Sequence, residues 1–464
     1  MQAPIEIPIT IVHHTETGYI QIAPAQQFNR LPAARQLSPE LSVEPELRTW
    51  QRNPTNRAAQ DDLRERLEEV GNRVYTLLDR ESLQSILDIQ GQKNNSLIWR
   101  RILVYTDRNA SQIPIETMWS DERPPEGESL GFVVANHAIP ISIVRHLGME
   151  PTASLEVESG LPLQMLVVFS NPQQEHRSLG EVIVEDGGLT FEGHLLEEKG
   201  ALDAQLGALI QLNLLEIQFL VGNESNHNNS VVYQGRVQLR NGQPYWKVEE
   251  ANTCDLEDTF LVLLSSMNWH ILHYFGHGAG NEDPELVLRP GHNLSCEAIG
   301  QKITQLPRVV ILNACESATP VGTNTPVLTG FATLFLLRGT VNLICMQMRV
   351  TPNTATLTTE QLYYRLSKSL FTRQMDFEES LYEVHKLVYN SPPRLDFFCP
   401  VLYARPVNGP IFAYQDDRLE VWKAIMEGRL PWSPVRFWSP TRLLKARSWC
   451  LRLREQIRTR GLSE

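Results

Sequence analysis

The segments WHILHYFGHGA, residues 269–279, and VVILNACESA, residues 309–318, decide the fold that this sequence predicts. Each begins as a short apolar run typical of a buried strand, and the two runs end abruptly at His277 and Cys315. In a parallel α/β sheet, functional side chains collect at the carboxyl ends of the strands, and neighbouring strands lie about 4.8 Å apart. We therefore expect His277 and Cys315 within or near hydrogen-bonding distance, as a thiol nucleophile and its base.

The residue types around this pair suit attack on a peptide carbonyl. A thiolate is the attacking species, and an adjacent imidazole raises the thiolate fraction and later protonates the leaving amine. Gly276 and Gly278 flank the histidine, which allows a sharp backbone turn and leaves no side chain over a substrate. The backbone N–H groups of Gly278 and Cys315 are the candidate oxyanion donors. No acidic residue is obviously placed to orient His277, so the sequence predicts a dyad.

Three side chains near the strand ends are candidates for a substrate pocket. Asn313 lies two residues before Cys315, on its face of the strand, and would form the floor of the pocket for the residue before the scissile bond. Glu316 follows the cysteine directly, and Gln347 follows the next predicted strand. An amide at position 313 would hold arginine or lysine less strongly than a carboxylate would.

The histidines and cysteines also have simpler interpretations. A cysteine at the end of a buried strand is usually a small packing residue. A metal-dependent hydrolase would need His270, His273 and His277 on one face, but their spacing lacks the strict geometry of a zinc site, and we expect His270 and His273 to be scaffold. The remaining cysteines are expected to be structural: Cys254, Cys296, Cys345, Cys399 and Cys450. The prediction therefore includes no cofactor and no metal.

Composition limits the classes of function. The 464 residues are 42% hydrophobic and 21% charged, which is typical of a globular protein with a substantial core. A net charge of −12 argues against a nucleic-acid-binding surface on the core, because phosphate contacts need surplus lysine and arginine. The six scattered cysteines suggest no disulfide framework. No segment approaches the roughly 18 to 20 apolar residues of a membrane span, so we expect a cytoplasmic protein with no transmembrane segment.

The chain divides into three predicted parts. Residues 1–155 form a smaller α+β region, with a hairpin near its start and a helix over 58–78. Residues 156–412 alternate strands and helices, which predicts an α/β fold with a mostly parallel six-stranded sheet flanked by helices. Its strands are expected at 163–169, 215–221, 270–275, 309–312, 341–346 and 397–404. Two polar segments, 173–200 and 222–250, have the composition of insertions, and the second could contain a hairpin.

The third part, residues 413–464, is a basic extension rich in tryptophan and arginine. One interpretation is a basic amphipathic helix that binds a partner, an acidic membrane surface or RNA. The other is a C-terminal helix docked on the preceding domain with a solvated basic face.

The motifs resemble those of the CHAT domain, a caspase-like family in the clan of caspases, separases and gingipains. The resemblance rests on FGHG at 275–278 and LNACES at 312–317. The segment IETMWSD at 115–121 is similar to the family's Pro-Trp-Glu segment, residues 132–147 to the strand after it, and 341–350 to the strand and loop after the cysteine helix. The resemblance implies a caspase-type fold and a dyad of His277 and Cys315. It also implies endopeptidase activity in regulated, often defence-linked cleavage of a protein partner.

We therefore expect a cysteine endopeptidase with a protein substrate, acting in a regulated bacterial defence or signalling setting. The sequence contains no internal repeat that could serve as a sensor, so activation would come from a protein partner, or the enzyme would be constitutively active. The alternative is a catalytically silent caspase-like scaffold or binding protein, because the N-terminal region and the basic extension both suit docking.

Overall fold

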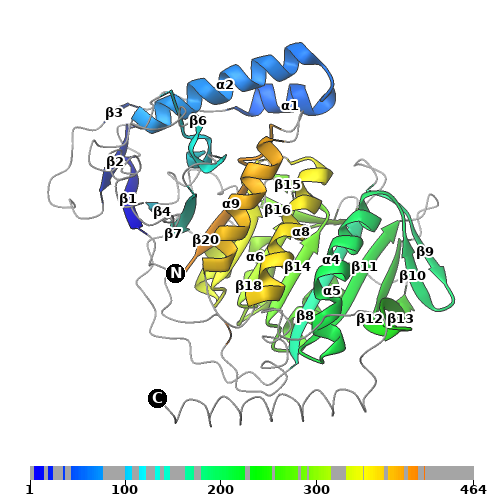
Figure 1. The fold of residues 1–464 in the computed structure, drawn as a ribbon. Coiled ribbons are helices and arrows are strands. Elements are labelled where there is room, and N and C mark those ends of the chain that lie inside the picture. The colour runs from blue at the N-terminus through cyan, green and yellow to red at the C-terminus, as the bar shows by residue number, and fades with distance from the viewer. Residues whose placement is uncertain are drawn as a thin grey trace, which may run out of the picture.

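In a computed structural model of the protein, five apolar segments pair as parallel strands at the centre of one large sheet (Figure 1). The structure describes residues 5–14, 19–24, 35–36, 43–76, 100–106, 114–121, 131–135, 140–146, 162–171, 179–224, 230–252, 256–280, 284–289, 292–314, 331–348, 350–369, 375–390, 395–405 and 412. The central strands, in spatial order, are β19 (Asn342–Met346), β18 (Val309–Asn313), β14 (Ile271–Phe275), β8 (Leu163–Asn171) and β11 (Leu215–Glu224). Apolar runs suit this position, because helices cover both faces of a parallel sheet.

Alternate residues of the central strands point to opposite faces, and each face buries its own set of apolar side chains. Val167, Phe219 and Ile311 share one core cluster with the helices that cover the first face. Those helices are α4 (Gly193–Gln211), α8 (Pro352–Ser369) and α9 (Met375–Tyr389). Figure 1 shows these three helices in front of the sheet.

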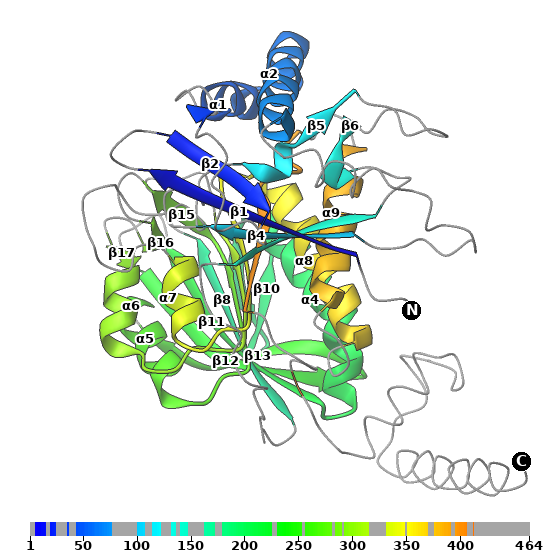
Figure 2. The same ribbon diagram turned by 90° about the vertical axis from the view of Figure 1, so that its left-hand side faces the viewer.

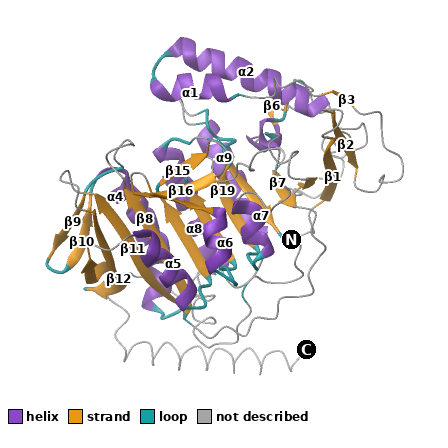
Figure 3. Ribbon diagram, turned by 180° about the vertical axis from the view of Figure 1, so that it is seen from behind, coloured by secondary structure: helices purple, strands orange, loops and turns teal. Residues whose placement is uncertain are grey.

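The second face of the sheet has a different cover. Leu166, Leu272 and Val310 belong to a second core cluster on this side. The helices here are α5 (Leu256–Ser266), α6 (Cys296–Lys302) and α7 (Phe331–Leu337), which Figure 3 shows from behind. A three-stranded sheet also contributes to this cluster, formed by β15 (His277–Gly280), β16 (Pro284–Arg289) and β17 (His292–Ser295).

Two hairpins extend the sheet beyond β11. Their strands are β12 (Ser230–Arg240) with β13 (Gln243–Asn252), and β9 (Val182–Glu185) with β10 (Gly188–Phe191). Each hairpin closes through two residues that both have positive φ, Asn241 and Gly242 in one and Asp186 and Gly187 in the other. Tight antiparallel turns favour Asn-Gly and Asp-Gly because these residues adopt the left-handed conformation at low cost.

The N-terminal region extends the same sheet on the opposite side. Its strands are β1 (Ile5–His14), β2 (Tyr19–Pro24), β3 (Arg35–Gln36), β4 (Arg100–Thr106) and β7 (Ile141–His146). β7 meets β20 (Pro400–Ala404) through one pairing, Tyr403 with Arg145. The helices α1 (Glu44–Arg52) and α2 (Arg57–Thr76) lie at one end of the molecule (Figure 2). Short elements complete the region: η5 (Ile115–Thr117), β5 (Trp119–Ser120), β6 (Gly131–Phe132) and η6 (Val133–Ala135).

The structure confirms an α/β fold with a parallel centre, and all six predicted strands are present in the sheet. The predicted strand number is wrong, because fifteen strands of the described residues form this sheet, with antiparallel pairs toward both edges. The segments 173–200 and 222–250, which have the composition of insertions, contain β9, β10, β12 and β13, and the hairpin of β12 and β13 confirms the hairpin expected in the second segment. Half-polar hairpin strands lack the apolar run that identifies a central strand.

Some expectations concern residues that the structure does not describe. These are the predicted nucleophile Cys315, the predicted pocket residue Glu316, the structural roles expected for Cys254 and Cys450, and the basic extension, residues 413–464. Because one sheet runs from the N-terminal region into the rest of the chain, the boundary near residue 155 is not a break in the sheet. The three-part division stays a prediction.

Candidate active site

The two strands that carry the histidine and cysteine motifs are neighbours in the sheet. β14 and β18 pair in parallel, and Phe275 lies opposite Asn313 at their carboxyl ends. The N–H of Gly276 continues this ladder by donating to the carbonyl oxygen of Asn313 at 3.2 Å. His277 follows Phe275 by two residues, and Cys315 follows Asn313 by two residues. The two motifs therefore leave the same edge of the sheet at the same level.

A set of hydrogen bonds fixes the backbone at His277. His277 begins β15 and pairs with Val287 of β16. The hydroxyl oxygen of Tyr274 lies 3.0 Å from the carbonyl oxygens of both His277 and Val287, to which it can donate. Ser170, at the end of β8, donates to Val287 at 2.6 Å and lies 3.0 Å from the carbonyl oxygen of Leu288. Burial raises the pKa of Tyr274 above its usual value, which keeps the phenol protonated as a donor.

Gly276 is required for packing. A Cβ atom there would lie 2.7 Å from the hydroxyl oxygen of Tyr274 and 2.9 Å from the Cβ of Ser170. It would also lie 3.0 Å from the backbone oxygen of Ser170, which cannot move away as a flexible side chain can. The sequence predicted a turn that needs glycine, and the structure adds that a neighbouring strand passes too close for any side chain.

Gly278 and Asn313 have well-defined positions. Gly278 is the second residue of β15, opposite Leu286, and its role as an oxyanion donor stays a prediction. Asn313 is 2% exposed, and its amide nitrogen donates to Glu198 at 3.2 Å, to Thr359 at 2.5 Å and to the carbonyl oxygen of Ala355 at 3.2 Å. The side chain thus points under α4 and α8 instead of into an open pocket, because residue 313 shares the face of Val309 and Ile311. This burial favours a structural role over the predicted pocket floor.

His273 belongs to the same buried polar cluster as Asn313. Its Nε2 lies 2.9 Å from Oε1 of Glu198, and both side chains are fully buried. Its Nδ1 lies 3.1 Å from the hydroxyl of Tyr363 on α8. Burial, together with the charge of Glu198, raises the pKa of Tyr363 well above its usual value. The Glu198 cluster, defined as Glu198, His273, Asn313, Thr359 and Tyr363, therefore lies between the sheet and helices α4 and α8.

His270 has different neighbours from His273 and His277. Its Nδ1 accepts the backbone N–H of Gln164 at 2.9 Å, and its ring packs edge-on against Phe412. Burial and the charge of Arg308 lower the pKa of His270 to about 4, so the imidazole is neutral at pH 7. Within the part of the chain that the structure describes, no three or more His, Cys, Asp or Glu side chains gather in a way that could hold a metal ion.

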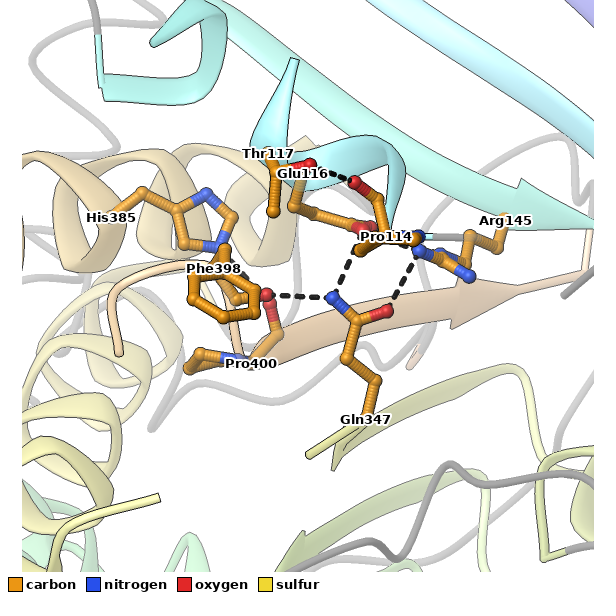
Figure 4. Close-up of polar contacts among 8 residues, drawn as sticks. All are labelled: Pro114, Glu116, Thr117, Arg145, Gln347, His385, Phe398 and Pro400. Atoms are coloured by element: carbon orange, nitrogen blue, oxygen red, sulfur yellow. Dashed lines mark hydrogen bonds and ion pairs between the residues drawn. The ribbon is translucent and has the colours of Figure 1, made fainter. Parts of the chain in front are cut away.

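Gln347, the third predicted pocket residue, lies directly after β19 and is half-buried. Its side-chain oxygen accepts from Arg145 at 3.0 Å, and its side-chain nitrogen donates to the carbonyl oxygen of Phe398 at 3.0 Å (Figure 4). Arg145 in turn binds Glu116, and both of these charged side chains are at most 1% exposed. The predicted place of Gln347 in a substrate pocket stays a prediction.

Three cysteines among the described residues, Cys296, Cys345 and Cys399, are buried and carry no disulfide. Burial raises the pKa of Cys345 above its usual value, which disfavours the reactive thiolate. These positions fit the structural role expected for them.

Several residues around the site were not predicted as parts of it: Ser170, Tyr274, Glu198, Glu116 and Arg145. The sequence does contain one signal for Arg145, because it is the only charged residue of the buried strand ISIVRH apart from its terminal histidine. A buried arginine needs a carboxylate partner. The hydroxyl donors gave no such signal, because serine and tyrosine are common in strands.

Comparison with known proteins gives one family match, to the CHAT domain over residues 68–429. No curated protein matches the chain significantly. Among the described residues no helix is both long and apolar enough to cross a membrane.

Solved structures with a similar chain path include the separase–securin complex of Saccharomyces cerevisiae, with 11% identity and a TM-score of 0.46, covering 87% of this chain but only 30% of that chain. The complex of pro- and mature domains of Porphyromonas gingivalis RgpB has 10% identity and a TM-score of 0.37, covering 77% and 79% of the two chains. An inactive zymogen C11 protease from Parabacteroides distasonis has 10% identity and a TM-score of 0.29, covering 45% and 55%. Because the match over residues 68–429 spans more than half of the 464 residues and includes both strand-end motifs, the chain belongs to the CHAT domain family.

Proposed function

We propose that the protein is a cysteine endopeptidase in which Cys315 is the nucleophile and His277 is the base. The observation that carries the proposal is the register of β14 and β18, in which Phe275 lies opposite Asn313 and Gly276 donates to Asn313. His277 comes two residues after Phe275 in the sequence, and Cys315 comes two residues after Asn313. Neighbouring strands lie about 4.8 Å apart, a separation that an imidazole and a thiol can bridge.

The proposed reaction follows from these two groups. His277 takes the proton of Cys315, and the thiolate attacks the carbonyl carbon of the scissile peptide bond. The backbone N–H groups of Gly278 and Cys315 hold the negative oxygen that develops. His277 then protonates the leaving amine, and water hydrolyses the acyl-enzyme with the same imidazole as base.

The hydrogen bonds that fix the backbone at His277 support this role. Tyr274 and Ser170 hold the carbonyl groups of β15 and β16, so the histidine backbone is fixed before a substrate binds. A general base placed in advance on rigid elements avoids an ordering cost during the reaction. Membership of the CHAT family supports a protein substrate and an activating protein partner, in a regulated defence or signalling setting.

The experiment compares the wild type with Cys315→Ala and His277→Ala. Each variant is incubated with a protein library, new N-terminal peptides are identified by mass spectrometry, and labelling of Cys315 by a thiol-reactive peptide probe is followed. We expect both variants to lose cleavage by about 10³-fold or more, because nucleophile and base act as one unit. Labelling should disappear in Cys315→Ala and slow strongly in His277→Ala.

Matched controls are Cys296→Ser and His194→Ala. Cys296 is 9% exposed in α6, and His194 is a surface residue paired with Glu197 in α4, so neither belongs to the proposed dyad. Both controls should cleave like the wild type. Cleavage that survives in Cys315→Ala would reject the peptidase mechanism, and a wild type without any cleavage would favour a scaffold or binding protein.

A further inference from the structure

Arg145 connects the N-terminal region to the edge of the sheet that carries the proposed site. Its Nε donates to one carboxylate oxygen of Glu116 at 3.0 Å, and its Nη2 donates to the other. The guanidinium is fully buried in β7 and Glu116 is 1% exposed in η5. Burial is the largest single influence and lowers the pKa of Arg145, but Glu116 and Tyr403 together outweigh it, so that this pKa is raised. The guanidinium of Arg145 therefore stays charged, and its fork geometry fixes the direction of both side chains.

The same guanidinium holds Gln347. Nη2 of Arg145 donates to the side-chain oxygen of Gln347 at 3.0 Å. The side-chain nitrogen of Gln347 donates to the carbonyl oxygen of Phe398 at 3.0 Å and lies 3.4 Å from Glu116. Its backbone N–H donates to the carbonyl oxygen of Cys399 at 3.0 Å. Figure 4 shows the amide of Gln347 between Arg145 on one side and Phe398 on the other.

Gln347 occupies a specific level beside the cysteine strand. β18 and β19 pair in parallel, and Leu312 lies opposite Cys345. Continuing the count by two residues on each strand leads to Ala314 and Gln347, and by three to Cys315 and Met348. A polypeptide bound across the carboxyl edge of the sheet would pass over the segment 347–348 next to the nucleophile. The arrangement of this segment therefore bears on how a substrate is held.

We propose that Arg145 is a positioning residue for substrate binding: together with Glu116 it holds Gln347, and through it the segment 347–348 at the end of β19, next to the end of β18 from which the chain continues to Cys315. The N-terminal region thereby contributes to the substrate site without touching the reacting atoms. This inference rests on the proposed peptidase function for its kinetic consequence, but the positioning itself has a structural readout. A purely structural ion pair would stabilise the fold and leave the segment and the substrate affinity unchanged.

The decisive variant is Gln347→Ala, because it removes the link to the segment and leaves the Glu116–Arg145 pair intact. We expect KM for a protein substrate to rise about tenfold, since one charge-assisted hydrogen bond and the order it imposes are lost. The value of kcat and the labelling of Cys315 by a small haloacetamide should stay within about twofold, because the dyad does not use this segment. Amide hydrogen exchange of peptides covering 343–350 should be at least about tenfold faster than in the wild type. Arg145→Lys, which lacks the fork, should shift KM and exchange in the same direction.

The matched control is Glu378→Gln. Glu378 of α9 is 4% exposed and accepts from Arg101 of β4 at 2.7 Å and from Ser142 of β7 at 3.2 Å, so it is also a buried carboxylate that binds the N-terminal strands. These two contacts lead to β4 and β7. This variant should melt at a lower temperature but keep wild-type KM and wild-type exchange over 343–350.

The outcomes separate this inference from the proposed function. Wild-type KM and wild-type exchange in Gln347→Ala would overturn the positioning role, and so would an equal rise of KM in Glu378→Gln. Faster exchange over 343–350 in a protein that cleaves nothing would uphold the positioning of the segment and reject the peptidase. Unchanged exchange over 343–350 in a Gln347→Ala protein that still cleaves would reject the positioning of the segment and uphold the peptidase.

Discussion

Gly276, next to His277, has no room for a side chain. A Cβ atom there would meet two neighbours. One is the hydroxyl of Tyr274, which binds the carbonyl group of His277, and the other is the backbone of β8, the strand next to β14. The hydroxyl of Tyr274 has one proton, so small movements of the turn change which carbonyl receives it. The position of His277 thus depends on a close contact between Gly276 and Ser170 that any side chain would disturb.

Gly276→Ala is therefore expected to reduce both activity and stability. The added methyl group would push the turn away from Ser170, at a cost of roughly 1–3 kcal/mol in the free energy of unfolding. A displacement of about 1 Å at the base would lower kcat by about 10- to 100-fold. Urea unfolding and steady-state kinetics on the same preparation measure the two effects.

Gly200→Ala is the matched control for this change. Gly200 lies in α4 and a Cβ atom there would meet no heavy atom within 4 Å. The control should gain about 0.5–1 kcal/mol, because alanine is the better helix former, and its kinetics should match the wild type. Equal kinetics for the two alanine variants would show that the close contact at Gly276 does not position the histidine.

At the scale of elements, the Glu198 cluster joins two helices to two strands beneath the proposed site. Glu198 comes from α4, His273 from β14, Asn313 from β18, and Thr359 and Tyr363 from α8. Low local dielectric strengthens such a network when its members are paired and makes an unpaired member costly. Apolar packing is not directional, so it does not fix the position of α4 along its own axis on the sheet. The hydrogen bonds and the ion pair of the Glu198 cluster do fix it.

Glu198→Ala should therefore destabilise the protein strongly. The change leaves the buried donors of Asn313 and Thr359 without their shared acceptor and removes the carboxylate beside His273, which costs about 3–5 kcal/mol. Glu198→Gln keeps an acceptor oxygen at nearly the same place and should cost less than Glu198→Ala. Chemical denaturation monitored by tryptophan fluorescence gives both values.

Glu197→Ala serves as the comparison within the same helix. Glu197 is 54% exposed and its partner is the surface histidine His194, so its loss should change stability by no more than about 0.5 kcal/mol. A loss in Glu198→Ala as small as that in Glu197→Ala would mean that the buried cluster contributes nothing to the docking of α4.

The sequence predicted the central elements because their physical signals are local. Short apolar runs such as β14 and β18 are typical of buried strands, and the abrupt change after each run points to His277 and Cys315. The strands of the outer hairpins are half polar, so their partners cannot be found by periodicity alone. Asn313 is buried because α4 and α8 cover its face of the sheet. The sequence around residue 313 does not show which helices lie there.

At the scale of the whole molecule, the N-terminal region and the α/β part share one core. Leu63, Leu67 and Val70 of α2 belong to the same cluster as Val384 and Val388 of α9. Two ion pairs add directional contacts in this half of the sheet: the buried pair of Arg145 with Glu116 and the partly buried pair of Arg101 with Glu378. The sequence predicts an N-terminal α+β region that ends near residue 155, but it does not predict this shared core, because contacts between distant segments leave no trace in a window of sequence.

A chain that begins at residue 156 should consequently fail to fold cooperatively. Removal of the N-terminal region uncovers Val384, Val388, Phe397 and Phe398, each worth roughly 1.5–3 kcal/mol of burial. Their sum is comparable with the whole stability of a typical protein. Loss of near-ultraviolet circular dichroism and binding of a hydrophobic dye would report the exposed surface.

Residues 1–155 supplied as a separate chain provide the control. Co-expression should restore part of the cooperative transition if the shared core is the reason for the loss. A truncated protein that melts at the temperature of the full chain would show that the two parts fold independently.

The ladder between β14 and β18 has a consequence for how this site could change over time. The paired residues run from Ile271 opposite Val309 to Phe275 opposite Asn313, and the hydrogen bond of Gly276 extends the ladder by one residue, so the register sets how the two strand ends align. Replacing one apolar residue by another leaves this register intact. Inserting or deleting one residue in either strand would shift one strand end along the other by about 3.3 Å and reverse the face of every side chain beyond the change. Natural variants of these two strands should therefore differ freely in apolar composition but keep constant length.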